Sequence, residues 1–581
     1  MRRYASDLPF GATVLPDRRT RFRLWAPAQE SVAVAFENSA LLPMERLPDG
    51  WFEAVADCPP GTLYRYRLAD GMLVPDPASR FQPDDVHGPS QTIDPAAYHW
   101  RNANWQGRPW RETVLYELHA GVLGGFACVA EQLPRLRELG VTAVELMPVN
   151  DFPGRRNWGY DGVLPYAPDS AYGTPDDLKA LVDAAHDQGL TIFLDVVYNH
   201  FGPDGNYLHA CAPQFFRDTH PTPWGPAIDF RRPEVRAFFT GNVLYWLMEY
   251  RFDGLRFDAV HAIEDQSWVD EMAAAVRDTI EPGRQVHLVL EHHNDASHLA
   301  RNIDAQWNDD AHNALHVLLT GESGGYYAGY ADRPAEKLAR CLAEGWAYQG
   351  EMSHYLGGPR GSSSAHLPPT AHVMFLQNHD QIGNRAFGER LTSLVSPRAL
   401  EAAIALVLLS PQIPLLFMGD ESASRSPFLF FTDHHGELAD AVREGRRNEF
   451  ARFADFADPH RRARIPDPNA PATFEASVPL PEPDHADARE ALYRRLLELR
   501  RQCIVPRLDN AHGGDACAIG DKAVLARWTM GDGATLTIAA NLGTEPVSLK
   551  PQPGRLLFAG TDLRPGTLPG CCTAAFLDGA A

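Results

Sequence analysis

Short apolar segments alternate with segments of helical periodicity through most of the region between residues 111 and 420. Strand, helix and strand repeated in this order predict a parallel sheet, because each parallel connection needs a crossover helix. Roughly eight such units favour a closed (β/α)8 barrel over an open sheet. We expect strands within 114–118, 142–149, 191–197, 254–260, 287–292, 372–380 and 414–420.

The two ends of the chain have a different pattern. Near the N-terminus, SVAVAF at 31–36 and LYRYRL at 63–68 alternate with the period of half-buried strands, which predicts a β-sandwich. AVLARWTM at 523–530 and TLTIAANL at 535–542 predict a small C-terminal β domain. The predicted fold is therefore α/β, with a sandwich over 1–100, a catalytic barrel with inserted loops over 101–503 and a β domain over 504–581.

Polar residues follow four of the predicted strands, always on the C-terminal side. They are Asp195, Asn199 and His200, then Arg256 and Asp258, then Glu291, and finally Asn378, His379 and Asp380. Strand C-termini converge on one face of a barrel, and charges there are costly unless they are paired or used. Asp195 taken alone could equally be a structural ion pair, but the whole set predicts a functional site on that face.

Several carboxylates on neighbouring strands suit cleavage of a glycosidic bond, in which one attacks the sugar and another protonates the leaving oxygen. Arg256 lies two residues before Asp258, so both point to one face, and its charge should keep Asp258 ionised. Glu291 has no cation on its own strand, so we expect a raised pKa and an acid role. His200 and His379 could donate hydrogen bonds to sugar hydroxyls.

The overall charge limits the partners of the chain. A formal net charge of −22 argues against nucleic acid or an anionic membrane as a partner, because both need a cationic surface.

Pro411 and Pro414 interrupt the uncharged stretch 402–419, which we expect to form a helix, a turn and a strand and not a membrane span. MRRYASDLPF at the N-terminus has no apolar segment behind it, so we expect no signal peptide and a cytoplasmic monomer or homodimer.

Four segments resemble, in order, the signature segments of the α-amylase superfamily, glycoside hydrolase family 13: DVVYNH at 195–200, GLRFDAV at 254–260, LEHH at 290–293 and QNHD at 377–380. WGYDG at 158–162 resembles the family's loop whose Tyr packs on the sugar in the −1 subsite. The resemblance implies that Asp258 is the nucleophile, Glu291 the general acid/base and Asp380 the acid that stabilises the transition state. It also implies that Tyr160, His200, Arg256 and His379 shape the −1 subsite.

Three longer segments, 147–168, 375–391 and 427–450, resemble the branch of that family that releases trehalose. The implied reaction is hydrolysis of the α-1,4 bond that joins a maltooligosaccharide to terminal trehalose in maltooligosyltrehalose. One departure is Gly-Asp-Glu-Ser at 419–422, where relatives often carry a Glu-Glu-Trp run. Further expected substrate-binding residues are Asp161, His261, Asp309, Asp310, His312, Gln381 and Asn384.

No cofactor or metal is expected. The chain has no HxH or HExxH spacing for catalytic metal. Many members of the family bind a structural calcium beside the residue that corresponds to Asn199, but the insertion after His200 is short and offers few carboxylates. Two alternatives stay open: a glucan branching or debranching enzyme of the same family, and a catalytically silent glycan-binding protein on the same fold.

Overall fold

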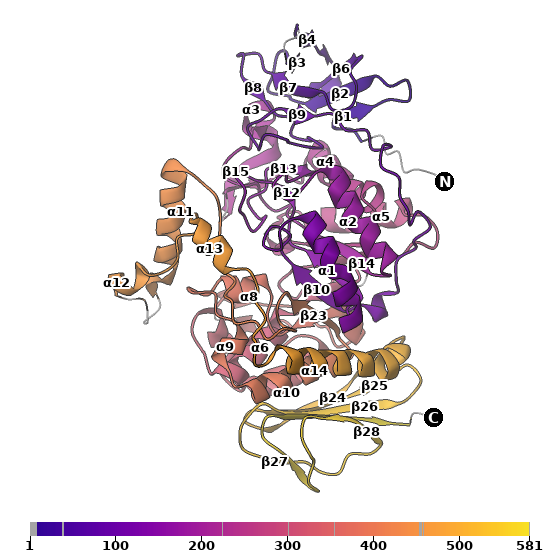
Figure 1. Ribbon diagram of the computed structural model, residues 1–581, viewed down its shortest axis with the longest axis vertical. Coiled ribbons are helices and arrows are strands. Elements are labelled where there is room, and N and C mark those ends of the chain that lie inside the picture. Colours follow the sequence, from indigo (N-terminus) through magenta and orange to yellow (C-terminus); the bar gives the residue numbers. More distant parts are fainter. Residues whose placement is uncertain are drawn as a thin grey trace.

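The computed structural model describes residues 8–37, 40–222, 225–299, 301–353, 355–452, 456 and 458–579. Three parts follow one another along the long axis of the molecule: the N-terminal strands, the barrel and a C-terminal antiparallel sheet (Figure 1). Residues 1–7, on which the expectation about a signal peptide partly rests, lie outside the described residues.

Two small sheets form the N-terminal part. One contains β1 (Gly11–Val14), β2 (Thr20–Trp25), β6 (Trp51–Ala56) and β5 (Glu45–Arg46). The other contains β4 (Leu42–Pro43), β3 (Ala33–Phe36), β7 (Leu63–Arg67) and β8 (Leu73–Val74), with β9 (Ser90–Gln91) paired to β7. The buried ring of Phe22 packs edge-on against Tyr64 of the other sheet, with ring centroids 4.8 Å apart. This packing confirms the predicted sandwich.

Eight parallel strands close into the predicted barrel. In spatial order they are β10 (Leu115–Leu118), β11 (Ala143–Leu146), β14 (Thr191–Val196), β17 (Gly254–Phe257), β18 (His287–Leu290), β19 (Ala305–Trp307), β22 (His372–Phe375) and β23 (Ile413–Phe417). Seven of them overlap the predicted segments. β19 was missed because three residues are too few to show a strand period.

Helices connect the barrel strands. They include α1 (Phe126–Leu139), α2 (Pro175–Asp187), α4 (Pro233–Leu244), α5 (Ser267–Thr279), α6 (Asp309–Thr320), α7 (Pro334–Glu344) and α10 (Pro397–Leu409). At the start of α2, Thr174 and Asp177 form a reciprocal capping box, as their spacing predicts. The uncharged stretch 402–419 contributes to α10, a turn and β23. No helix in the described part of the chain has the length and apolarity needed to cross a membrane.

Shorter elements decorate the barrel. They are α3 (Leu208–Cys211), α8 (His379–Gly383), α9 (Leu391–Leu394), and the strand pairs β12 (Asn150–Asp151) with β13 (Leu164–Pro168), β15 (Phe216–Thr222) with β16 (Gly225–Ile228), and β20 (Met352–Ser353) with β21 (Gly358–Pro359). After β23, α11 (Gly436–Glu449), α12 (Pro459–Arg462) and α13 (Pro471–Ala476) extend to one side of the barrel (Figure 1). α14 (Ala486–Leu499) then leads toward the C-terminal sheet.

The C-terminal sheet packs against the barrel helices. Its order is β24 (His512–Gly520), β25 (Ala523–Thr529), β26 (Thr535–Asn541), β30 (Cys572–Asp578) and β28 (Arg555–Ala559), with β27 (Val547–Ser548) and β29 (Thr567–Leu568) as a separate pair. The buried Trp528 donates its indole N–H to the Leu342 carbonyl of α7, 2.9 Å away. Thr573 Oγ1 donates to the Ala402 carbonyl of α10 at 2.7 Å. This sheet is the predicted C-terminal β domain.

Candidate active site

A cavity of about 650 Å³ lies at the C-terminal ends of the barrel strands. Asp258 directly follows β17, Glu291 directly follows β18, and Asp380 lies in α8 just after β22. Parallel strands therefore bring to one face three acids that are far apart in the sequence. The predicted residues that line this cavity are Tyr160, Asp161, His200, Asp258, His261, Glu291, Asp309, His379, Asp380, Gln381 and Asn384.

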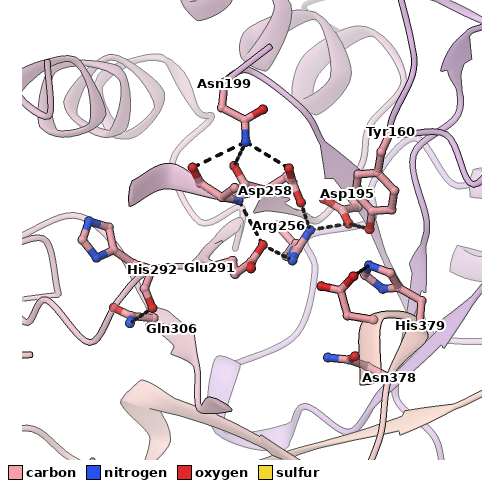
Figure 2. A network of polar contacts seen from close by, with 12 residues as sticks. Tyr160, Asp195, Asn199, Arg256, Asp258, Glu291, His292, Gln306, Asn378 and His379 are labelled. Atoms are coloured by element: carbon pink, nitrogen blue, oxygen red, sulfur yellow. Dashed lines mark hydrogen bonds and ion pairs between the residues drawn. The ribbon is translucent and has the colours of Figure 1, made fainter. Parts of the chain in front are cut away.

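The fully buried guanidinium of Arg256 joins the carboxylates at the base of the cavity (Figure 2). Its Nη1 donates to Asp195 Oδ2 at 2.6 Å and to Asp258 Oδ1 at 2.9 Å. Its Nη2 donates to Glu291 Oε2 at 2.5 Å. The guanidinium also lies over the Trp307 ring, 4.0 Å from the ring centroid. One permanent cation therefore holds three carboxylates from three neighbouring strands.

The pKa shifts of Asp258 and Glu291 both differ from those expected from the sequence. Burial and the neighbouring Glu291 carboxylate raise the pKa of Asp258 well above its usual range, more than Arg256 lowers it. Burial also raises the pKa of Glu291, but Arg256 and His261 outweigh it and bring that pKa to about 2. Glu291 has no cation on its own strand, but Arg256 reaches it from the adjacent strand, so the expected raised pKa is wrong. The two pKa values are therefore shifted in opposite directions, up for Asp258 and down for Glu291.

A second set of contacts links Tyr160 and His379 to neighbouring acids. Tyr160 Oη donates to Asp195 Oδ2 at 2.5 Å, and the Tyr160 ring stacks on His379 with centroids 5.0 Å apart. His379 Nδ1 contacts the buried Glu117 carboxylate, and its Nε2 lies 3.5 Å from Asp380 Oδ1. Burial lowers the pKa of His379, but Glu117 and Asp380 outweigh it and raise that pKa to about 9. His379 is therefore an imidazolium at neutral pH.

Replacing Glu117 by glutamine is expected to lower the pKa of His379. With folded and unfolded values of about 9 and about 6.5, the imidazolium stabilises the fold fully below pH ~6.5, and this contribution is lost as the pH rises through about 9. Glu117→Gln should therefore cost about 2–3 kcal/mol of unfolding free energy at pH 7 and less at higher pH. Urea unfolding at several pH values measures this.

Glu145→Gln is the matched control for that measurement. Glu145 lies in the adjacent strand β11, and burial and the neighbouring Glu117 carboxylate raise its pKa well above the usual range, which favours the uncharged form. Its amide variant should show a much smaller change that does not depend on pH between 6 and 9. A loss in Glu117→Gln that is equal at every pH would contradict the charge argument.

His200 lines the cavity, but its ring nitrogens are already engaged by the protein. Nε2 lies 2.9 Å from the Tyr160 carbonyl oxygen, and Nδ1 contacts Asn199 Oδ1. The expected hydrogen bond from His200 to a sugar hydroxyl would have to replace one of these contacts, and it stays a prediction. The His200 ring links the loop that carries Tyr160 to the end of β14.

Asp310 and His312, both expected to bind substrate, do not line the cavity. The Asp310 carboxylate accepts from the backbone N–H groups of Ala347 and Tyr348 at 2.9 Å and pairs with Arg360 at 3.0 Å. His312 Nδ1 lies 2.7 Å from the Leu376 carbonyl. Both side chains therefore anchor α6 to neighbouring segments. The physical reason is helical geometry: positions 309 and 313 share a face of α6, and 310 and 312 point elsewhere.

Sequence reasoning missed two groups of residues. Glu117 and Glu145 lie inside apolar strands, and an acid within an otherwise apolar run was the signal that could have found them. The other group reaches the cavity from loops or from α11 and leaves no pattern in the sequence. Its members are His293, Arg360, Phe430, Arg446 and Glu449.

One group of side chains in the described residues could hold a metal ion. It consists of His292, Asp295 and His298. None of these three lines the cavity.

Three segments of the chain match known protein families, one in the N-terminal sandwich, one in the barrel and one in the C-terminal sheet. Residues 9–79 match carbohydrate-binding module 48, the isoamylase N-terminal domain. Residues 95–214 match the alpha amylase catalytic domain, and residues 511–575 match a domain of unknown function.

The similar proteins cover most of the chain. The malto-oligosyltrehalose trehalohydrolase of Deinococcus radiodurans is 41% identical over 90% of this chain and 89% of its own length. A Salmonella typhimurium crystal structure, described as an alpha amylase, is 45% identical with a TM-score of 0.93, over 98% and 99% of the two chains. A 1,4-alpha-glucan branching enzyme of Photobacterium profundum, 37% identical, covers 42% of this chain and 38% of its own length. The chain is therefore a glycoside hydrolase that belongs to the malto-oligosyltrehalose trehalohydrolase family.

Proposed function

We propose that this enzyme hydrolyses the α-1,4-glucosidic bond between a maltooligosaccharide and terminal trehalose in maltooligosyltrehalose and thereby releases trehalose. The observation that carries the proposal is the group formed by Asp258, Glu291 and Asp380 at the base of a polar cavity, in a chain of this family. Full-length similarity to trehalohydrolases, against partial similarity to a branching enzyme, favours hydrolysis over branching.

In this proposal the enzyme retains the anomeric configuration. Asp258 attacks the anomeric carbon while Glu291 protonates the oxygen of the departing trehalose. Glu291 then takes a proton from the water that releases the maltooligosaccharide from Asp258. Asp258 and Glu291 both bind the Arg256 guanidinium, which suits the carboxyl separation of ~5–5.5 Å in retaining enzymes. Asp380 binds ring hydroxyls and stabilises the positive charge of the transition state.

Catalysis requires a carboxylate at Asp258 and a proton on Glu291. In the free enzyme the pKa of Asp258 is raised and that of Glu291 is lowered, so the proposal needs a proton transfer to Glu291 when substrate binds. Because the two carboxyls interact strongly, their titration belongs to the pair and not to either residue. A sugar hydroxyl or leaving oxygen that displaces Glu291 from Arg256 would raise the pKa of Glu291 and favour this transfer.

Polar groups on both sides of the scissile bond give selectivity in this proposal. Tyr160 and His379 contact the sugar in the −1 subsite. Trehalose occupies the other side, near His261, Asp309, Gln381 and Asn384, which line the same cavity. A site that hydrogen-bonds a ligand rejects an analogue without the matching groups, because its own buried groups are then left unpaired.

The remaining partner expectations rest on the sequence. An uncharged sugar needs no electrostatic steering, so a net charge of −22 is compatible with this substrate. The proposed reaction requires no cofactor. The cytoplasmic location and the monomeric or homodimeric state stay predictions.

The test is product analysis with two substrates that contain the same number of glucose units, maltotriosyltrehalose and maltopentaose. Trehalose and maltotriose from the first, with little cleavage of the second, are expected. Rapid release of glucose or maltose from maltopentaose would contradict the proposal. New α-1,6 linkages would indicate a branching enzyme, and no turnover of either substrate would favour a glycan-binding protein.

A further inference from the structure

The loop that follows β18 contains three side chains with metal-binding chemistry outside the catalytic cavity. His292, Asp295 and His298 each offer one ligand atom, and these atoms all lie within 4.8 Å of one another. Two imidazoles and one carboxylate are a donor set suited to Zn²⁺ and related divalent ions. Figure 2 shows the His292 side chain apart from the residues grouped around Arg256.

His292 supplies the first independent sign of a ligand. Both of its ring nitrogens are buried, and neither has a hydrogen-bond partner among the described residues. Buried polar atoms without partners are uncommon and costly, because they lose their hydrogen bonds to water.

His298 supplies the second sign. Its Nδ1 lies 3.0 Å from Asp270 Oδ1, and a carboxylate on one ring nitrogen is the usual support for a histidine that binds metal through the other. Its Nε2 lies 3.2 Å from Gln266 Oε1. Gln266 Nε2 donates to the Val260 carbonyl at 2.8 Å and also to that of Ile263, which directs its Oε1 toward His298.

Both ring nitrogens of His298 face acceptor oxygens, but a neutral ring has only one N–H to donate. A neutral imidazole carries one N–H and cannot donate to both the Asp270 carboxylate and the Gln266 amide oxygen. A cation on Nε2 would satisfy the second nitrogen, and Gln266 Oε1 would become a candidate fourth ligand. The competing explanation is an imidazolium that donates to both oxygens, with no metal.

We propose that His292, Asp295 and His298 form a binding site for a divalent cation of the Zn²⁺ class. Such an ion would join the loop after β18 to α5 and the segment before it, where Asp270 and Gln266 lie. His292 is the residue directly after Glu291, so the site would brace the segment that carries one of the cavity acids. Binding itself does not depend on the proposed function.

Zn²⁺ titration of the EDTA-treated full-length protein against a chromophoric chelator tests the proposal. Wild type should bind one equivalent of Zn²⁺, and its affinity should be higher than that of His292→Ala or Asp295→Ala. Zn²⁺ should raise the Tm of wild type and not that of these two variants. Asp270→Asn should weaken binding about 10–100-fold through loss of the carboxylate support. His366→Ala, a change at an exposed histidine, is the matched control and should bind as wild type does.

Co²⁺ absorption spectra report the ligands directly. Intense visible bands in wild type that are lost in His292→Ala would support a protein-bound ion of low coordination number. Equal Zn²⁺ affinity in wild type and His292→Ala, or a Co²⁺ spectrum like that of the hydrated ion, would overturn the proposal. The Tm of each variant without metal shows whether it is folded, and the spectrum of Asp295→Ala provides a second readout if His292→Ala is not.

Discussion

Asp258→Ala is expected to lower kcat by at least ~10³-fold, because it removes the group that forms the covalent intermediate. The variant should still fold. Arg256 keeps two carboxylate partners, Asp195 at 2.6 Å and Glu291 at 2.5 Å, so no buried cation is left unpaired. Steady-state hydrolysis of maltotriosyltrehalose, with Tm as a check on folding, measures the effect.

Azide separates loss of the nucleophile from loss of the whole site. A small anion can enter the space left by the Asp258 carboxylate and attack the anomeric carbon from the same side, which yields a β-glycosyl azide detectable by NMR. Asp484→Ala, at an exposed position, is the matched control and should keep wild-type turnover. Near-native turnover of Asp258→Ala would show that Asp258 is not the nucleophile.

Glu291→Gln is expected to lower kcat on the natural substrate by ~10²–10⁴-fold, because the amide cannot protonate the departing trehalose. The loss should be much smaller with an aryl α-maltooligoside, since a phenolate leaves without protonation. The variant should also lose the alkaline limb of the pH–rate profile that reports the proton of the acid. The ratio of the losses on the two substrates measures the acid role.

The pH behaviour of this variant follows from the coupling between Asp258 and Glu291. In wild type these two groups titrate as a pair, with apparent pKa values that belong to both. Glu291→Gln removes a negative neighbour, so the pKa of Asp258 should fall. Glu475→Gln, an exposed change of the same type, should leave both substrates and the profile unchanged. Equal losses on natural and aryl substrates would contradict the assignment of Glu291 as the acid.

Much of the barrel could be predicted from local pattern. Seven strands overlap apolar segments recognised in the sequence, and the capping box at Thr174 marked the start of α2. A buried parallel strand is apolar on both faces, so its signal is strong wherever the strand is long enough. The three-residue β19 is too short to show a period, and only its pairing with β18 and β22 identifies it.

The sequence predicted which site residues lie at the ends of strands, but it did not predict the contacts between side chains on different strands. The period of two placed Arg256 with Asp258 correctly, since that rule concerns a single strand. It could not show that Arg256 also reaches Glu291, because this contact depends on the register between β17 and β18. The sequence therefore predicted a raised pKa for Glu291, whereas in the structure this pKa is lowered.

The amino-acid sequence by itself determined which residues follow which strand, and thus that Asp258, Glu291 and Asp380 meet on one face of a barrel. This follows from local rules, since parallel strands expose their C-terminal ends together. Only the tertiary structure decided the directions in which the pKa values of Asp258 and Glu291 shift, which face of α6 reaches the cavity, and that His292, Asp295 and His298 come together. Each of these depends on distances of a few ångströms between separate segments, and electrostatic energies change steeply over such distances.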